Sequence, residues 1–238
     1  MIAILKQFAP HHRELRQRLI TILVAVAVMS VAAYIFIEPI VQFFLQPLFR
    51  AHPGIRRLVY TNLTEAFISY IKLSLMVGTI TAFPIILYQV WMFVAPGLLE
   101  REKKIVSSIV LWASLLFLAG GLFAYFIVLP KMLSFFMTYA DANLKPLPRL
   151  GNYLSFVVRM IAAFALAFEI PFLMVMASRT GLVAREYFRA KRMNFYIVIV
   201  IGSFLLSAGE VTATVLLALP LFALYEAGIL ATRMLPGG

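Results

Sequence analysis

Long apolar runs dominate this chain and limit it to folds that a lipid bilayer can solvate. The 238 residues are 63% hydrophobic and only 13% charged, which leaves too little polar material to cover a water-exposed globule. A helix needs about 18 or more apolar residues to cross roughly 30 Å of hydrocarbon at 1.5 Å per residue. Several runs meet that requirement, so the sequence predicts an all-α integral membrane protein.

Six segments are apolar enough to be interpreted as membrane spans. The fifth would reach only about 21 Å as a helix, which is short for a full crossing. Few residues separate it from the sixth, so these two spans are predicted to form a tight hairpin. The prediction is therefore six transmembrane helices, of which the fifth and sixth are short. The predicted spans are residues 19–37, 67–88, 105–129, 153–177, 194–207 and 211–230.

Basic residues gather in the short loops between these spans. The formal net charge of +11 would by itself also suit a nucleic-acid ligand. Clusters beside membrane spans are explained more simply by insertion topology, because cytoplasmic loops carry an excess of Lys and Arg. The loops on the same side as both chain ends hold most of these bases. Both termini are therefore predicted to be cytoplasmic, and no nucleic-acid partner is expected.

Residue types that carry catalysis or bind metals are sparse. The chain has no cysteine, and its three histidines, His11, His12 and His52, lie outside the apolar runs. Without thiolates or intramembrane imidazoles, no metal site, cofactor or catalytic residue is predicted. An intramembrane hydrolase is disfavoured for the same reason, and the chain is not expected to be an enzyme.

Two acidic positions mark the predicted cytoplasmic face. Glu14 is spaced i, i+4 from Arg18, so a helical ion pair would be sufficient to explain it. Glu102 follows a helix-breaking Pro96-Gly97 and precedes span three, where the helix dipole favours a carboxylate. The alternative is that both acids bind a pair of guanidinium groups, because carboxylates bind guanidinium bidentately and Lys imitates it poorly.

Three further acids lie in or beside the later spans. Glu169 is well inside span four, beside Pro171, where an ionised carboxylate is costly and normally faces a cavity or a partner. It is predicted to form a functional polar patch, and a hydrogen bond to a neighbouring helix is the alternative. Glu210 is a candidate cap for the start of span six. Glu226 is interpreted as structural, able to pair with basic residues of the loops.

The order of short motifs along nearly the whole chain resembles that of the TatC family of the twin-arginine protein translocase. No single motif is specific, but their order across six spans is. The motifs are His11 with Glu14-Leu15-Arg16 and Arg18, Thr64-Glu65-Ala66-Phe67 with Lys72, Pro84 with Tyr88-Gln89, Phe93 with Ala95-Pro96-Gly97-Leu98 and Glu102, Phe123-Ala124-Tyr125-Phe126 with Pro130, Tyr153 with Phe168-Glu169-Ile170-Pro171, and Pro220 with Leu224-Tyr225-Glu226.

This resemblance implies a single TatC-like transmembrane domain over residues 1–238 with a cupped arrangement of helices. It implies a receptor and core subunit that binds the twin-arginine signal peptides of folded proteins, with export driven by the proton-motive force. Glu169 would lie in a groove within the membrane. The signal-peptide contacts that the resemblance implies are Glu14, Arg16, Gln89, Phe93 and Glu102.

The resemblance also implies partners and a location. The single-span proteins TatB and TatA would dock on the last two helices, at positions matched by Ser207, Glu210 and Thr214. This hairpin departs from the family's Thr-Pro-Pro-Asp-like run. Self-association, contact with membrane lipids and a multi-pass location in a bacterial or archaeal plasma membrane are also implied. A proton-coupled secondary transporter that uses Glu169 is the alternative function that the residues leave open.

Overall fold

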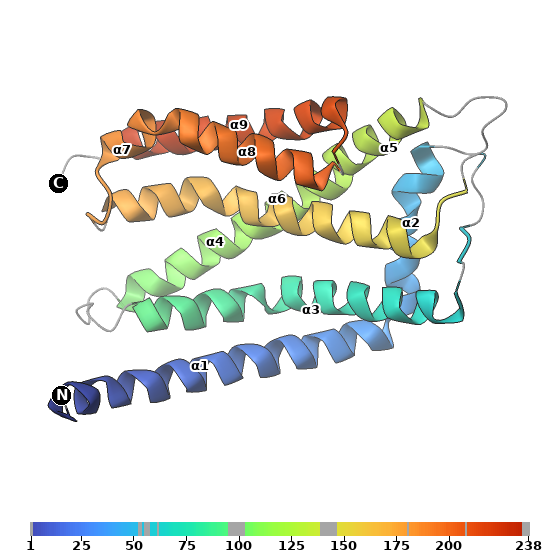
Figure 1. Cartoon of the computed structure of the whole chain (residues 1–238). Coiled ribbons are helices and arrows are strands. Elements are labelled where there is room, and N and C mark those ends of the chain that lie inside the picture. The colour runs from blue at the N-terminus through green and yellow to red at the C-terminus, as the bar shows by residue number, and fades with distance from the viewer. Residues whose placement is uncertain are drawn as a thin grey trace. The chain divides into compact units, whose positions relative to one another are not determined.

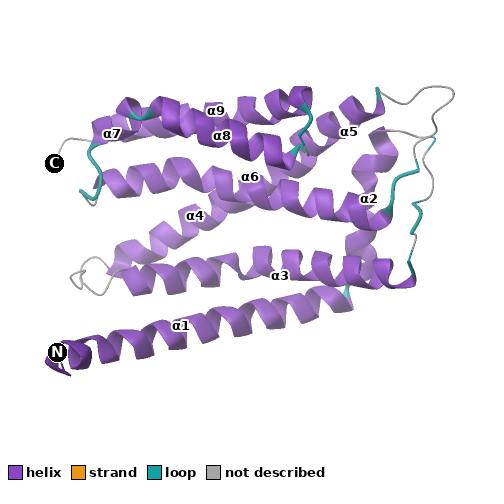
Figure 2. Cartoon of the chain, viewed as in Figure 1, coloured by secondary structure: helices purple, strands orange, loops and turns teal. Residues whose placement is uncertain are grey.

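Helices make up most of the described part of this chain (Figure 2). The computed structural model describes residues 2–51, 54, 58–60, 62–94, 103–138, 147–179, 181–207 and 209–234. Within these ranges the only strand-like pairing is an isolated bridge between Val59 and Arg149. The elements are α1 (Ile2–Ile35), α2 (Ile37–Ala51), α3 (Leu63–Val94), α4 (Lys103–Phe123), the π-helix η1 (Ala124–Val128), α5 (Leu129–Met137), α6 (Leu150–Arg179), α7 (Arg185–Ala190), α8 (Arg192–Leu206) and α9 (Val211–Met234).

The predicted spans correspond to these helices. Five segments of the described chain are long and apolar enough to cross a membrane, and the remaining predicted span is α8, an apolar helix of 15 residues. The short fifth span is thus confirmed. The prediction that the sixth span is also short is wrong, because α9 has 24 residues and reaches about 36 Å. Its backbone hydrogen bonding continues for one turn beyond the apolar run that ended the prediction at Leu230.

Proline placement explains where the first span ends. The helix α1 stops at Ile35, and α2 starts at Ile37 after a single turn residue, Phe36. Pro39 has no N–H to donate to the carbonyl of Ile35, so the α-helical ladder loses a hydrogen bond at this point, which favours a break. Proline is tolerated in the first turn of the new helix. The segment between the first two spans therefore forms a separate helix, α2.

The chain divides into two compact units, of which the first comprises Met1–Phe43 and Thr61–Leu115. Within it, α1 and α3 lie side by side and run in opposite directions (Figure 1). They approach closely at Gly78, where a methyl group would lie 2.5 Å from the backbone nitrogen of Ser30. Large apolar side chains along α1, such as Leu23 and Val28, are exposed, as required of a helix that faces lipid.

The second unit comprises Phe44–Tyr60 and Leu116–Gly238. Here α8 and α9 form the predicted hairpin, and α9 also packs along α6 (Figure 1). Its core contains almost fully buried side chains from α5, α6 and α9, among them Met132, Phe164 and Leu217. That all 238 residues form one domain stays a prediction.

Candidate functional site

Three of the residues singled out in the sequence meet at one end of the α1 and α3 pair. The Nε atom of Arg18 donates to Glu14 Oε1 at 3.2 Å, and its Nη2 atom forms an ion pair with the same oxygen. The Nη1 atom of Arg18 donates to Gln89 Oε1 at 3.5 Å. Arg18 therefore connects the two helices and brings the predicted contacts Glu14 and Gln89 into one polar cluster.

The cluster keeps an accessible acceptor. The Glu14 side chain is 38% exposed, whereas that of Arg18 is 17% exposed. Every hydrogen bond that Glu14 accepts within the described residues goes to Oε1, which leaves Oε2 without a partner there. The expected i, i+4 pair is thus confirmed. It occupies one carboxylate oxygen, so the pair and an external guanidinium are not mutually exclusive.

The other predicted signal-peptide contacts differ in their exposure, and one of them is not described by the structure. Arg16 is exposed on α1, and Phe93 is partly buried one turn beyond Gln89 near the end of α3. Glu102 lies outside the described residues. The four described contacts therefore belong to the same α1 and α3 unit, whereas the predicted pairing of Glu14 with Glu102 stays a prediction.

Glu169 is buried in the second unit. It is 5% exposed, and its Oε1 atom has no hydrogen-bond partner in the described part of the chain. Two close helix contacts flank it along α6. Gly120 of α4 abuts Phe168, and Gly228 of α9 abuts Pro171. The carboxyl group is therefore enclosed by protein, and its role in a peptide-binding groove stays a prediction.

The hairpin between α8 and α9 uses its polar side chains internally. The hydroxyl groups of Ser207 and Thr214 lie 2.7 Å apart and are buried. A Glu210 carboxylate oxygen accepts the backbone N–H of Ala213, so the predicted cap of span six is confirmed. These contacts hold a hairpin that, as the sequence shows, lacks the Thr-Pro-Pro-Asp-like run of the family. A partner helix would meet a hairpin whose two hydroxyl groups are already paired.

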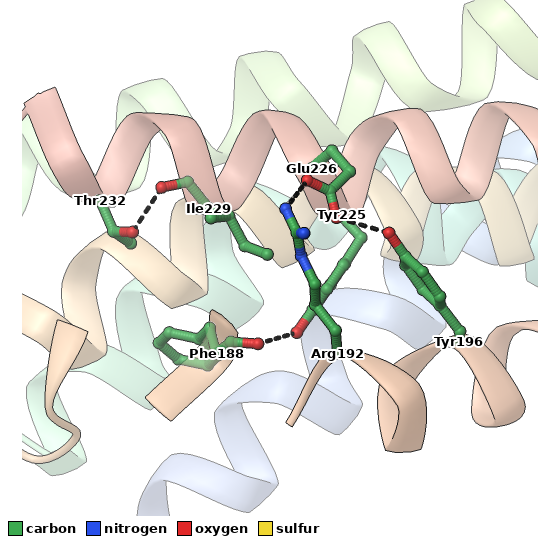
Figure 3. A network of polar contacts seen from close by, with 7 residues as sticks. All are labelled: Phe188, Arg192, Tyr196, Tyr225, Glu226, Ile229 and Thr232. Carbon is green, nitrogen blue, oxygen red and sulfur yellow. Dashed lines mark hydrogen bonds and ion pairs between the residues drawn. The ribbon is translucent and has the colours of Figure 1, made fainter. Parts of the chain in front are cut away.

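A second polar network ties α7 and the start of α8 to α9 (Figure 3). Arg192 forms an ion pair with Glu226 Oε2, and the Tyr196 hydroxyl donates to Glu226 Oε1 at 2.5 Å. The Tyr225 hydroxyl donates to the backbone oxygen of Phe188 at 2.6 Å. Pairing of Glu226 with a loop base was expected. The two tyrosines were missed, although Tyr225 lies within a motif that carried the family resemblance.

Comparison with known proteins decides the family. The model of the family described as Sec-independent protein translocase protein (TatC) matches residues 10–220. The chain belongs to the TatC family. The TatC of Aquifex aeolicus is 38% identical over 230 residues, covering 94% of this chain and 95% of that protein. The TatC of Desulforapulum autotrophicum is 35% identical, covering 95% of this chain and 84% of that protein. The Escherichia coli K12 TatC is 34% identical over 227 residues, with 95% and 88% covered.

A solved TatC structure has the same fold. The crystal structure titled as the twin arginine translocase receptor TatC aligns with a TM-score of 0.84 at 35% identity, covering 94% of this chain and 98% of that one. The six-span TatC fold predicted from the sequence is therefore confirmed. The chain is a membrane protein and a core subunit of the twin-arginine translocase. Membership of a protein translocase family argues against the alternative function, a proton-coupled secondary transporter.

Proposed function

We propose that this chain is the translocase receptor that binds twin-arginine signal peptides of folded proteins. The observation that carries the proposal is the state of Glu14, which is partly exposed, is fixed by Arg18 and has a second carboxylate oxygen without a partner among the described residues. A guanidinium group binds such an oxygen in a short, charge-assisted hydrogen bond. Glu14 is thus suited to receive one arginine of a signal peptide.

The Arg18 contact lowers the cost of that binding. A free glutamate loses side-chain rotamer freedom when it is ordered by a ligand. Here the intrachain pair already orders the side chain, and Gln89 holds Arg18 from the neighbouring helix. The remaining oxygen is consequently preorganised, and more of the interaction energy contributes to affinity.

The second arginine is assigned to Glu102, whose position in the sequence lies close to the end of α3. Phe93 offers an aromatic surface to an arginine side chain, and the exposed Arg16 can donate to peptide carbonyl groups. Gln89 completes this set of contacts. The preference for arginine over lysine follows, since only the planar guanidinium can bond two acceptors in a fixed fork geometry.

The rest of the assignment concerns the membrane and the partners. We place both termini in the cytoplasm of a bacterial or archaeal cell, because most loop bases lie on that side. TatB and TatA are assigned to the α8 and α9 hairpin around Ser207, Glu210 and Thr214, and Glu169 to an intramembrane groove. Self-association in the receptor complex and export driven by the proton-motive force complete the proposal. TatC-family membership supports each of these assignments.

Peptide binding tests the receptor function directly. The purified full chain in detergent is titrated with a fluorescent twin-arginine peptide and with a matched Lys-Lys peptide. Replacing Glu14 with Gln removes a charge-assisted hydrogen bond of about 1.5–3 kcal/mol, which corresponds to roughly 10- to 100-fold weaker binding. Glu102→Gln is expected to have a similar effect. The matched control is Glu38→Gln, because Glu38 is exposed at the opposite end of the first span.

Two outcomes would count against the proposal. One is equal affinity for the twin-arginine and Lys-Lys peptides, which would remove the role of guanidinium recognition. The other is an equal loss of affinity in the Glu14 and Glu38 variants, which would indicate an effect of net charge alone.

The orientation has a separate test. The natural chain contains no cysteine, so a single introduced cysteine reports one position without background. Leu147 before α6 and Leu182 after it are both well exposed. In intact cells, a membrane-impermeant maleimide is expected to label Leu147→Cys and to leave Leu182→Cys unlabelled until the cells are lysed. The reverse pattern would refute the proposed orientation.

A further inference from the structure

A small open pocket lies within the second unit, where the end of α2 meets η1 and α5. Its volume is about 180 Å³, and its lining includes Arg50, Tyr125, Phe126 and Ser134. This volume exceeds severalfold the roughly 30 Å³ that one water molecule occupies in the liquid. The pocket is therefore large enough for a small polar group of several heavy atoms. None of its residues belongs to the proposed peptide-binding surface.

The π-helix shapes one wall of this pocket. In η1 the N–H of Leu129 donates to the oxygen of Ala124, five residues earlier. Pro130 has no N–H, so the carbonyl of Phe126 lacks its α-helical donor. Two adjacent aromatic residues of η1 point in different directions. Tyr125 is buried with its ring centroid 5.8 Å from that of Phe44, whereas Phe126 is 58% exposed.

The pocket lies at the depth of lipid headgroups. The Tyr153 hydroxyl donates to the backbone oxygen of Phe44 at 2.8 Å, which fixes α2 beside the first turn of α6. The helix α6 has 30 residues, or about 45 Å, and exceeds a hydrocarbon core of roughly 30 Å. Its end turns therefore extend into the headgroup region. The helix α2, which carries Arg50, lies at that level.

Arg50 gives the pocket an unbalanced positive charge. Its only hydrogen bond among the described residues goes to Gln46 Oε1 at 3.4 Å, and no carboxylate pairs with it there. The Ser134 hydroxyl is exposed at the same pocket. Arginine binds phosphate oxygens bidentately, and a hydroxyl adds one more donor. Phe126, Pro47 and Pro130 provide apolar surface beside these donors.

We propose that this pocket binds the phosphodiester headgroup of an anionic phospholipid. Arg50 and Ser134 contact the phosphate oxygens, and the glycerol and the first acyl carbons lie against Phe126 and the two prolines. This combination of a basic group, a hydroxyl and apolar surface at the bilayer boundary matches the amphipathic chemistry of a lipid better than that of a soluble anion. The inference is independent of the proposed signal-peptide site.

Native mass spectrometry of the purified full chain can measure this binding. Dioleoyl phosphatidylglycerol is titrated into the detergent-solubilised protein, and the lipid-bound fraction is recorded. Arg50→Gln is expected to weaken binding about tenfold and Ser134→Ala about twofold, as loss of a charged and a neutral donor predicts. Lys131→Gln is the matched control, because it removes the same charge from an exposed position of α5 that does not line the pocket.

The same assay separates the alternatives. Equal weakening by Arg50→Gln and Lys131→Gln would indicate diffuse electrostatics and overturn the pocket. Displacement of the lipid by millimolar inorganic phosphate would assign the site to a free anion instead. A photoactivatable phosphatidylglycerol in nanodiscs provides an independent readout without any variant. Crosslinks are expected in residues 44–51 and 124–134, and crosslinks confined to other segments would refute the proposal.

Discussion

Two adjacent glycines of α4 provide a sharp test of how closely the helices of the second unit pack. A methyl group on Gly120 would lie 2.6 Å from the backbone oxygen of Phe164, 2.8 Å from Phe168 Cβ and 2.9 Å from Ala165 Cα. These atoms belong to the backbone or its first side-chain carbon, so they cannot move without displacing α6. On Gly121 the nearest atom would be a side-chain carbon of Ile161 at 3.5 Å, an ordinary van der Waals contact.

The two Gly→Ala substitutions should therefore have opposite effects on stability. Both gain roughly 0.5–1 kcal/mol from the lower backbone entropy of alanine in a helix. At Gly120 overpacking costs about 1–3 kcal/mol, which leaves a net loss of roughly 0–2.5 kcal/mol. At Gly121 the gain is not opposed by a clash. The expected difference in free energy of unfolding between the variants is consequently about 1–3 kcal/mol.

Sodium dodecyl sulfate titration of the protein in mild detergent micelles, followed by circular dichroism, measures this difference. The midpoint for Gly120→Ala should fall below that of the natural chain, and the midpoint for Gly121→Ala should equal or exceed it. Equal midpoints for the two variants would refute the close approach of α4 to α6. A lower midpoint for Gly121→Ala alone would refute the assignment of Gly120 as the glycine that packs against the backbone of α6.

Two further substitutions test polar contacts in the same unit by the same titration. Tyr153→Phe removes a buried hydrogen bond to the backbone oxygen of Phe44 and should lower the free energy of unfolding by about 1–2 kcal/mol. An unchanged midpoint would show that this bond does not hold α2 to α6. Glu226→Gln breaks the ion pair with Arg192, in which the two side chains are 40% and 37% exposed, so only about 0.5–1 kcal/mol should be lost. The exposed Glu186 provides a control, and an equal loss in Glu186→Gln would argue against a specific role for the pair.

Hydropathy predicted the spans well because a bilayer imposes a minimum length on every crossing helix. The ends of the helices were less predictable. The helix α6 begins at Leu150 and ends at Arg179, beyond the predicted residues 153–177, because backbone hydrogen bonds do not stop where polar side chains begin. The π-helix was not predicted at all. Its apolar composition is that of an ordinary span, and only Pro130 indicated an interruption of the helical hydrogen bonding nearby.

The candidate site shows a similar limit. Spacing alone predicted the Glu14 and Arg18 pair, since i, i+4 neighbours meet on any helix. It could not predict that Arg18 also reaches Gln89, because that contact depends on how α1 and α3 pack. Family motifs did select Gln89, which spacing would have passed over. The hydrogen bond between Ser207 and Thr214 likewise required the geometry of a closed turn.

The π-helix also fixes the rotational phase of everything that follows it in the same span. A five-residue hydrogen-bonded turn holds one residue more than the helix on either side would, so the later residues are turned by about 100° relative to an uninterrupted α-helix. Met132 and Leu133 are buried in this phase. Deleting one residue of η1 would remove the widened turn yet rotate both side chains out of the core. Insertions and deletions in this stretch are therefore far less tolerable than its plain apolar composition suggests.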